Sequence, residues 1–426
     1  MSEQQFETWA REWTERSRIA SRSIANASPA QKDAVLMRLA SLLRLNQDQI
    51  EKENQKDVAL AKERGLSSAL VDRLELSGTR IEKLAQSVEE VARLPDPVGD
   101  IESITTQPSG IRVGRMRVPL GVILIVYESR PNVTIDAAIL CMKAGNAVIL
   151  RGGKEAAYTN QLLSTLVRRA LREEGVHEDV VTLIDKPDRD ALYTLLKQSG
   201  QIDLAIPRGG TSLIDAVNQH ARVPVVQHYQ GICHVYVHRD AKIDQAIEII
   251  LNAKVQRPGV CNALECVVVD DEVASNLLPA LFDKLTKAGV EVRACERSLS
   301  LAGTNHPGVK AAVQDDFSTE FLDAICAVKV VRDIDECFSF LQAHGSQHTE
   351  SIVTENHSAA MRFLRTVDAS CVMVNASTRF NDGGQLGLGA ELGISTTKLH
   401  AYGPMGLEEL CARKFIVLGE GHIRTS

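Results

Sequence analysis

A cysteine in a Pro-Gly turn is the residue of this chain whose chemistry is easiest to infer. Cys261 follows Pro258 and Gly259 and lies between a helical stretch and the apolar run 264–269. A thiol at the start of such a loop is displayed as a nucleophile, and sulfur suits acyl transfer through a thioester. Taken alone, however, a cysteine on a turn is more often a reduced bystander than a nucleophile. The catalytic interpretation therefore depends on a second element.

That second element lies far upstream, where an apolar segment runs into a polar loop. Residues 121–127 have the composition of a buried strand, and residues 128–133 follow as a loop just before a helix. The loop contains Asn132, whose side-chain amide can donate a hydrogen bond to a developing oxyanion. The chain thus offers both parts that acyl chemistry needs, a thiol and an oxyanion donor.

Two glycine loops each follow a predicted strand and precede a predicted helix. Glycines at this position let the backbone approach an anion at a helix N-terminus, and Arg or Lys adds charge. A tight turn with a solvated cation is the competing interpretation of either loop, since neither is a dinucleotide or Walker fingerprint. A third glycine-rich stretch, 382–389, is interpreted as a structural or substrate-lining loop. The two candidate phosphate loops consist of Arg151, Gly152, Gly153 and Lys154, and of Arg208, Gly209, Gly210 and Thr211.

Length, charge and cysteine usage exclude several classes of protein. The chain has 426 residues, more than one core usually holds, so two or three domains are expected. A net charge of -7 without a basic run argues against nucleic acid, and no apolar run is long enough to predict a membrane span, so we expect a cytoplasmic protein. The nine cysteines show no metal-ligand spacing, which predicts reduced thiols and no metal site. Those in apolar contexts are expected in the core: Cys141, Cys266, Cys326 and Cys371.

Several elements must position these residues. The first hundred residues have helical periodicity, and 101–105 with 111–117 predict an antiparallel hairpin. From residue 121 strands and helices alternate, which implies parallel β-α-β units with ligands at the carboxyl ends of the strands. The predicted strands form a first series at 121–127, 147–150, 180–184, 203–206 and 223–226, and a second at 233–237, 264–269, 325–331, 351–353 and 371–375.

Short motifs along most of the chain resemble those of one enzyme family. They are found at 117–122, 127–134, 145–155, 256–262, 374–380, 398–401 and 403–410. In these segments the sequence is similar to the γ-glutamyl phosphate reductases, the proline-biosynthesis branch of the aldehyde dehydrogenase superfamily. The resemblance runs from about residue 28 to the C-terminus.

The resemblance implies an α/β fold of the aldehyde dehydrogenase type. It has a Rossmann-type cofactor lobe, an α/β catalytic lobe with the cysteine, and a small β element for oligomerisation. The corresponding segments are 1–103 and 119–236 for the nucleotide-binding domain, 237–400 for the catalytic domain, whose C-terminal part returns toward the cofactor domain, and 104–118 with 401–426 for the oligomerisation element. The last of these holds the hairpin and a C-terminal strand at 414–418.

The resemblance also implies a reaction, the NADPH-dependent reduction of L-glutamyl 5-phosphate to L-glutamate 5-semialdehyde and phosphate through a cysteine thioacyl intermediate. This is the second step of proline biosynthesis from glutamate. Cys261 matches the nucleophile and Asn132 the oxyanion donor, and the two glycine loops match those that face the cofactor. The resemblance further implies a homo-oligomer, and glutamate 5-kinase, which makes the labile acyl phosphate, is a candidate partner. Residues expected to bind the substrate are Arg130, Gln230, Asn375 and Arg379.

The stretch 227–234 departs from the family pattern. Aldehyde oxidisers carry a glutamate base in this region, and its absence here favours a reductase. The reductase family itself has two carboxylates in this stretch, so Gln227, Tyr229 and Gln230 are substitutions. Two alternatives therefore stay open. One is an NAD(P)-linked aldehyde dehydrogenase that oxidises a small aldehyde, and the other is a catalytically impaired family member that acts as a binding protein.

Overall fold

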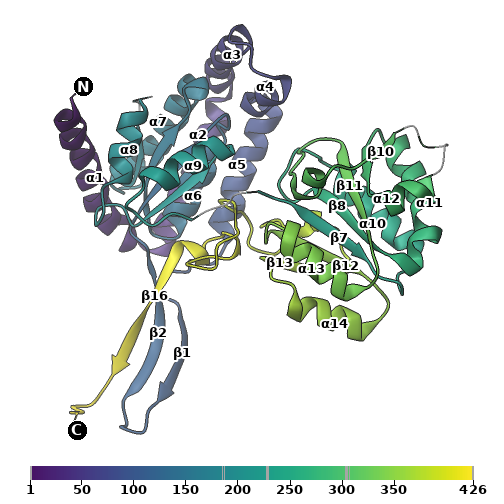
Figure 1. Cartoon of the computed structure of the whole chain (residues 1–426). Helices are drawn as coiled ribbons and strands as arrows, with labels where there is room; N and C mark the ends of the chain where they lie inside the picture. Colours follow the sequence, from purple (N-terminus) through teal and green to yellow (C-terminus); the bar gives the residue numbers. More distant parts are fainter. Residues whose placement is uncertain are drawn as a thin grey trace.

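Two α/β lobes and an antiparallel arm make up the chain (Figure 1). The computed structural model describes residues 2–184, 186, 188–226, 230–302, 306 and 308–424. The arm projects from the first lobe, and the C-terminus lies at its far end. Within the described part of the chain, no helix is both long and apolar enough to cross a membrane.

The first lobe is built on a parallel sheet with the order β5-β4-β3-β6. These strands are β3 (Val122–Tyr127), β4 (Ala147–Gly152), β5 (Val181–Leu183) and β6 (Leu204–Arg208), close to their predicted positions. The predicted strand at 223–226 contributes only an isolated bridge between Ala205 and Val225. Pro224 has no N–H to donate, which limits this segment to a short contact at the sheet edge.

Helices cover both faces of this sheet. Ile123, Ile125 and Tyr127 of β3 pack into one buried cluster, while Val122 and Leu124 pack into the cluster on the opposite face. Because both faces are buried, β3 has a continuous apolar sequence rather than an alternating one. The helices of this lobe are α1 (Glu3–Ala25), α2 (Pro29–Leu45), α3 (Gln47–Glu63), α4 (Ser68–Leu74), α5 (Gly78–Arg93), α6 (Val133–Lys143), α7 (Ala157–Glu173), α8 (Arg189–Leu196) and α9 (Thr211–His220).

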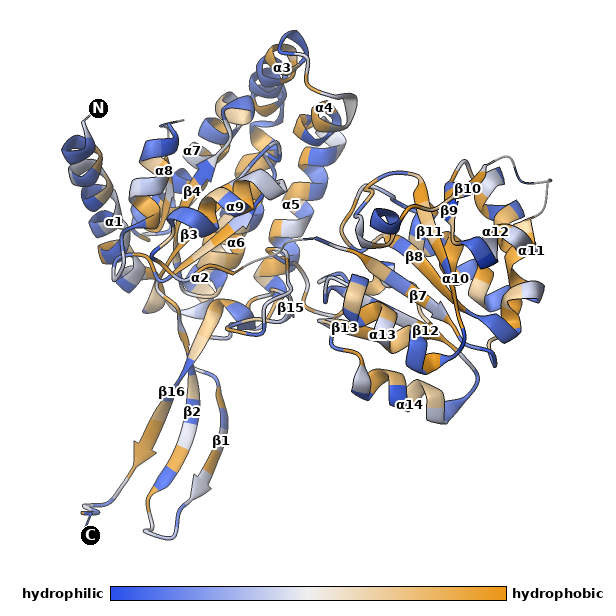
Figure 2. Cartoon of the chain, viewed as in Figure 1, coloured by the Kyte–Doolittle hydropathy of each residue, from blue (hydrophilic) through white to orange (hydrophobic). Residues whose placement is uncertain are grey.

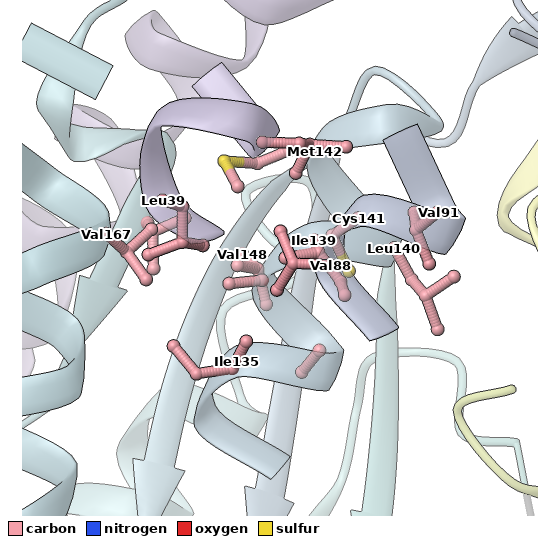
Figure 3. Packing of buried hydrophobic residues seen from close by; sticks show 14 of the residues in the cluster. Leu39, Val88, Val91, Ile135, Ile139, Leu140, Cys141, Met142, Val148 and Val167 are labelled. Carbon is pink, nitrogen blue, oxygen red and sulfur yellow. The ribbon is translucent and has the colours of Figure 1, made fainter. Parts of the chain in front are cut away.

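The larger of these two clusters holds the helical N-terminal segment against the sheet. Figure 3 shows Leu39 of α2 beside Val167 of α7, and Val88 of α5 near Ile139 of α6. All four side chains are fully buried. Val148 of β4 belongs to the same cluster, so α2 and α5 pack on α6 and α7, which cover this face of the sheet. α1 also contributes Ala10 to the cluster on the opposite face.

The second lobe contains a parallel sheet with the order β10-β9-β11-β8-β7-β12-β13. β9 and β10 were not predicted from the sequence, because both are short and contain charged residues and thus lack a strong strand signal. Only β10 lies at the edge of the sheet, since β9 pairs with both β10 and β11. The strands are β7 (Cys233–Val237), β8 (Leu264–Asp270), β9 (Glu291–Ala294), β10 (Val309–Ala311), β11 (Ile325–Val331), β12 (Thr349–Val353) and β13 (Cys371–Val374). The helices are α10 (Ile243–Val255), α11 (Asp271–Lys287), α12 (Glu296–Ala302), α13 (Ile334–His344) and α14 (His357–Thr366). Since β7 belongs to this sheet, the predicted domain boundary at residue 236 falls inside a strand of the second lobe.

The arm is the predicted oligomerisation element, in which the hairpin near residue 110 pairs with a strand close to the C-terminus. Its strands are β1 (Ile101–Thr106), β2 (Arg112–Pro119) and β16 (Cys411–Leu418), in the antiparallel order β1-β2-β16. Between β13 and β16 the chain passes through β14 (Ile394–Ser395) and β15 (Gly403–Pro404). Hydrophobic residues lie along β16 (Figure 2), and Phe415 and Val417 are 68% and 58% exposed.

Candidate active site

The predicted nucleophile lies in the turn that joins α10 to β8. Cys261 thus precedes β8 and is at the amino edge of the second sheet, whereas Arg130 and Arg208 follow or end β3 and β6 in the first lobe. Both arginines act on the charge of the Cys261 thiol, so the two edges face each other. The site forms where the carboxyl ends of the first sheet meet the amino ends of the second.

Gly231, just before β7, packs directly against the backbone of the nucleophile Cys261. A Cβ at this position would lie 2.1 Å from the carbonyl oxygen of Cys261 and 2.9 Å from its Cα. The Gly231 N–H donates a hydrogen bond to the carboxylate of Glu320. Glycine is required here because any side chain would push the nucleophile loop away.

The Cys261 thiol is held in its protonated form in this state. Burial raises the pKa of Cys261 to about 11, the Arg208 guanidinium opposes this shift, and Glu391 and Glu320 add to it. Arg130 also favours the thiolate. Deprotonation is therefore promoted by the two arginines and resisted by burial and by two carboxylates.

Those two carboxylates were missed in the sequence, where the stretch 227–234 was searched for a base. Glu320 and Glu391 come from later segments, and burial raises the pKa of both. Glu391 accepts a hydrogen bond from the N–H of Gly383 at 2.9 Å, so the start of the glycine-rich stretch 382–389 contacts this side chain. No local sequence motif indicates either residue, because both are far from Cys261 in sequence and come near its thiol only in the folded protein.

Guanidinium groups from both lobes gather around the thiol. Burial lowers the pKa of Arg130 to about 10, and the nearby charges of Arg208, Arg73 and Arg257 lower it further. Burial likewise lowers the pKa of Arg379. Its guanidinium also interacts electrostatically with Arg257 and with the Cys261 thiol. A cluster of cations that weaken one another is suited to bind an anion, because a phosphate or carboxylate relieves their repulsion. Arg130 and Arg379 were predicted to bind substrate, and the cluster contains both.

Arg208 was predicted to face the cofactor, but its guanidinium lies near the thiol. A Cβ on Gly393 would be 2.3 Å from Nη1 of Arg208, and Gly393 has a φ of 132°. Gly393 therefore leaves the space that the guanidinium fills, and its backbone conformation favours glycine. Arg208 also lowers the pKa of Glu391, so its charge acts on that carboxylate as well as on Cys261.

The rest of the second glycine loop lies against the carboxylate of Glu128, a residue of the protein itself. The Gly210 N–H, just before Thr211 at the start of α9, donates to Glu128. A Cβ on Gly209 would lie 2.9 Å from Oε2 of the same carboxylate. The anion position that was predicted for a cofactor phosphate at this helix N-terminus thus has Glu128 beside it.

The first glycine loop opens onto a cavity of about 510 Å³. Gly152, Gly153 and Lys154 line it, together with residues of α3, α7 and β5 and with Lys186. A Cβ on Gly152 would lie 2.2 Å from the side-chain amide of Asn160. The glycine keeps the cavity open, and its charged lining residues are the two lysines and one carboxylate, Glu53. These features fit the nucleoside part of a phosphorylated dinucleotide.

Arg151 in the same loop is placed differently from Lys154. It is 8% exposed, burial lowers its pKa, and the carboxylates of Glu128 and Glu155 oppose that shift. Glu155 in turn accepts a hydrogen bond from the Ser129 hydroxyl at 3.1 Å. The charge of Arg151 is thus shared with two carboxylates, whereas Lys154 lines the cavity. Both were predicted to contact the cofactor.

The predicted oxyanion donor Asn132 occupies the N-cap position of α6, where its side chain makes no capping hydrogen bond. Its side-chain amide donates to Oδ2 of Asp136 at 2.8 Å, and burial raises the pKa of Asp136 to about 6. The amide has a second hydrogen available for an oxyanion. Among the described residues there is no hydrogen bond between Asn132 and the nucleophile loop, so its role as donor stays a prediction.

The remaining predicted residues lie outside the arginine cluster. Asn375 has a φ of 53°, and both ends of its side-chain amide bond the backbone of Thr354, at 2.8 and 2.9 Å. This pairing gives Asn375 a structural role at the ends of β12 and β13. Gln227 and Tyr229 lie outside the described residues. Gln230 lines a second cavity of about 400 Å³, whose other lining residues include Ile232, His344, Ser346 and Thr396.

The free cysteines differ in exposure. Cys261, Cys295 and Cys371 are partly exposed, and the other six are buried. The prediction that Cys371 lies in the core was wrong, because it begins the edge strand β13. Cys261 differs from Cys371 in having arginines close enough to favour its thiolate.

Comparison with known proteins agrees with the fold and with the motifs. The profile of the aldehyde dehydrogenase family matches residues 6–299. The chain is 51% identical over 413 residues to the gamma-glutamyl phosphate reductase of Aquifex aeolicus, covering 96% of this chain and 95% of that protein. It is 53% identical over 405 residues to the enzyme of that name from Oleidesulfovibrio alaskensis, covering 95% and 96%.

Solved structures give the same result. The crystal structure of gamma-glutamyl phosphate reductase from Thermotoga maritima superposes with a TM-score of 0.94 at 42% identity, covering 97% of this chain and 99% of that one. An acetylating aldehyde dehydrogenase from Geobacillus thermoglucosidasius shares the fold, with a TM-score of 0.70 at 18% identity over 100% and 99% of the chains. This chain belongs to the aldehyde dehydrogenase family, within the branch of the γ-glutamyl phosphate reductases.

Proposed function

We propose that this chain catalyses the reduction of L-glutamyl 5-phosphate by NADPH to L-glutamate 5-semialdehyde and phosphate, the second step of proline biosynthesis from glutamate. The observation that carries the proposal is a free thiol, Cys261, among the guanidinium groups of Arg130, Arg208 and Arg379. Acyl phosphates are anionic electrophiles, so a thiol nucleophile inside a cationic cluster suits them. The names of the curated relatives support the same substrate.

The first half of the reaction transfers the acyl group to the protein. The Cys261 thiolate attacks the carbonyl carbon, a C–S bond forms, and the carbonyl oxygen becomes an oxyanion. We assign its stabilisation to the Cys261 backbone N–H and the Asn132 amide. When the oxyanion collapses, the C–O bond to phosphate breaks and phosphate leaves, which gives a thioester on Cys261. Arg130 and Arg208 stabilise the thiolate before attack and the anionic leaving group afterwards.

The second half releases the aldehyde. When bound, NADPH supplies the hydride that reduces the thioester carbon. The oxyanion donors again hold the negative oxygen, and its collapse expels the Cys261 thiolate and frees the aldehyde. No water takes part in either half, so no base for hydrolysis is needed. Glu320 and Glu391 raise the pKa of Cys261, so the thiolate is most easily formed when the arginines outweigh them.

We assign the adenosine end of NADPH to the cavity beside the first glycine loop. Gly152 and Gly153 allow close approach of the backbone, and Lys154 and Lys186 are the cations of the lining that can meet a 2′-phosphate. This placement supports a preference for NADPH over NADH. It gives Lys154 the larger share of the preference, because the charge of Arg151 is shared with Glu128 and Glu155.

We further propose that the arm joins copies of this chain into an oligomer. Phe415, Val417 and Leu418 on β16 are exposed on a strand with an unpaired edge, which is a surface that another strand can cover. Glutamate 5-kinase stays a predicted partner. The prediction of a cytoplasmic enzyme is supported by its chemistry, because a catalytic free thiol beside eight other free cysteines suits a reducing compartment.

The test is the reverse reaction with glutamate 5-semialdehyde and NADP. Reduction of NADP should depend on added phosphate, and Cys261→Ser should lose activity by several orders of magnitude because the hydroxyl is a far weaker nucleophile here. Cys371→Ser, which changes another partly exposed thiol, serves as the matched control and should keep activity. Turnover without phosphate would favour an aldehyde-oxidising enzyme, and a fully active Cys261→Ser would refute the thioacyl route.

A further inference from the structure

Buried polar side chains lie directly behind the nucleophile, and the mechanism above does not use them. Cys233, His348, Thr349 and Asn381 are each 0% exposed. They come from separate parts of the second lobe, the start of β7, the start of β12 and the loop after β13. Burying polar groups is unfavourable unless they bond one another, so a connected set at this position calls for an explanation.

The set begins at the backbone of the nucleophile itself. The Cys233 thiol donates to the carbonyl oxygen of Cys261 at 3.2 Å. On its other side, the Cys233 sulfur is 3.5 Å from Nδ1 of His348. Gly231 packs against the same Cys261 carbonyl. The carbonyl is therefore held between a glycine that leaves room for it and a thiol that bonds it.

The set closes on the neighbouring residue, Asn262. Nδ1 of His348 lies 2.7 Å from Oγ1 of Thr349, which accepts a hydrogen bond from the Asn381 side-chain amide at 2.8 Å. The Asn381 carbonyl accepts from the Asn262 side chain at 2.8 Å, and the Thr378 hydroxyl donates to the Asn262 carbonyl at 2.7 Å. Two successive carbonyls of the nucleophile loop are thus fixed from the core side.

We propose that Cys233 and His348 are positioning residues for the reaction. Through the bond to its carbonyl they hold Cys261 so that its thiol and its backbone N–H face the substrate. This inference rests on the proposed function, in which Cys261 is the nucleophile and its N–H an oxyanion donor. A displacement of about 1 Å in such a group can reduce the rate by about a hundredfold. A hydrogen bond that fixes the loop from behind therefore matters for catalysis although it never touches the substrate.

The test compares substitutions of two buried cysteines of the same sheet. Cys233→Ala removes the donor to the Cys261 carbonyl, and Cys233→Ser keeps one. Cys326→Ala is the matched control, because Cys326 is also 0% exposed and its thiol bonds the carbonyl of Ala327, on its own strand. Steady-state kcat and KM, melting temperature, and the rate at which iodoacetamide modifies Cys261 are measured for each variant, with the modified peptide identified by mass.

Cys233→Ala should lower kcat by about tenfold to a hundredfold and slow the alkylation of Cys261, with little change in KM. Cys233→Ser should restore most of both rates, and Cys326→Ala should lower only the melting temperature. His348→Leu should repeat the loss in kcat, which keeps the proposal testable if Cys233→Ala fails to fold. Equal melting-temperature losses in Cys233→Ala and Cys326→Ala, with unchanged kcat and alkylation rates, would overturn it. Alkylation does not require turnover, so this result is distinct from a failure of the proposed reaction.

Discussion

The two glycine loops of the cofactor lobe have nearly the same sequence pattern but different surroundings. Each follows a parallel strand, has an arginine before two glycines and leads into a helix. The loop at 151–154 opens onto a cavity that is lined by Lys154 and Lys186. The loop at 208–211 has Glu128 at its helix N-terminus and sends Arg208 toward Cys261. One loop is suited to the cofactor and the other to the reacting centre.

The difference teaches that tertiary neighbours decide what an arginine in such a loop does. Arg151 lies near Glu128 and Glu155, whose charges act on its guanidinium within the lobe. Arg208 projects past Gly393 to the seam between the lobes, where Glu391 and the thiol share its charge. Neither Glu128 nor Gly393 is part of the loop that it affects.

Arg208→Ala should have the largest effect among the loop substitutions. It removes a cation that favours the Cys261 thiolate and that can bind the phosphorylated substrate. We expect kcat/KM for glutamyl phosphate to fall by about a hundredfold, since charge-assisted hydrogen bonds are worth about 1.5 to 3 kcal/mol each. The KM for NADPH should stay close to its original value in steady-state kinetics. A loss confined to NADPH binding would contradict this account and would mean that Arg208 binds the cofactor.

The pH dependence of Cys261 reactivity also tests the surroundings of the reacting centre. The folded pKa of Cys261 is raised to about 11, so the thiol is mostly protonated from pH 7 to 9. Alkylation of the free enzyme should therefore accelerate by about tenfold per pH unit over this range, because only the thiolate reacts. A rate that reaches a plateau below pH 8 would mean that the arginines already hold a thiolate.

By the same reasoning, the stabilisation from keeping this thiol neutral is fully present below the unfolded pKa. It is lost as the pH rises through the folded pKa of about 11, since the unfolded chain then ionises first. Cys261→Ser should therefore flatten the alkaline loss of stability in a pH series of denaturant midpoints. An unchanged series would argue that the folded protein does not raise the pKa of this thiol.

Alanine at matched glycines separates the two loops directly. A Cβ at Gly152 would lie 2.2 Å from the Asn160 amide at the cavity, whereas one at Gly210 would meet nothing within 4 Å. Gly152→Ala should raise the KM for NADPH by about tenfold, because the buried Asn160 side chain in the lining must shift to make room for the methyl group. Gly210→Ala should leave both substrates unaffected, since its φ of -73° suits alanine. Equal effects of the two substitutions would contradict the assignment of the cavity.

Lys154→Ala should have the smallest effect. Lys154 is exposed, so solvent screens its charge, and we expect the preference for NADPH over NADH to fall by about threefold to tenfold. Ratios of kcat/KM for the two cofactors measure this. Arg151→Ala is the comparison, because it should lower stability through the uncompensated carboxylates Glu128 and Glu155 more than it changes the preference. An unchanged preference in Lys154→Ala would contradict the assignment of the 2′-phosphate to this cavity.

Much of the fold was predictable because its signals are local. β3, β7 and β11 have apolar runs that are typical of a buried strand, and α2 has local start signals, since the Ser28 side chain caps it ahead of Pro29. β9 and β10 were missed because such short strands with charged residues carry no apolar run. The segment 223–226 was overestimated because Pro224 interrupts its pairing.

The candidate site was predictable only in part, since much of it exists only in three dimensions. Cys261, Arg130 and Arg379 were named from motifs, and the structure brings them together. Glu320, Glu391 and Gly231 were missed, although they set the charge and the shape behind the thiol. Their sequence separation from Cys261 hides them, and only packing shows that Gly231 must lack a side chain.

The central claim is that Cys261 carries the acyl group between the two half-reactions. It is tested most directly by mixing the enzyme with glutamate 5-semialdehyde and NADP without phosphate, quenching rapidly in acid, and locating the adduct by peptide mass. We predict a burst of one NADPH per active chain with a glutamyl group on Cys261, and rapid loss of that group when phosphate is added before the quench. An adduct on another residue, or turnover without any adduct that phosphate removes, would contradict the account.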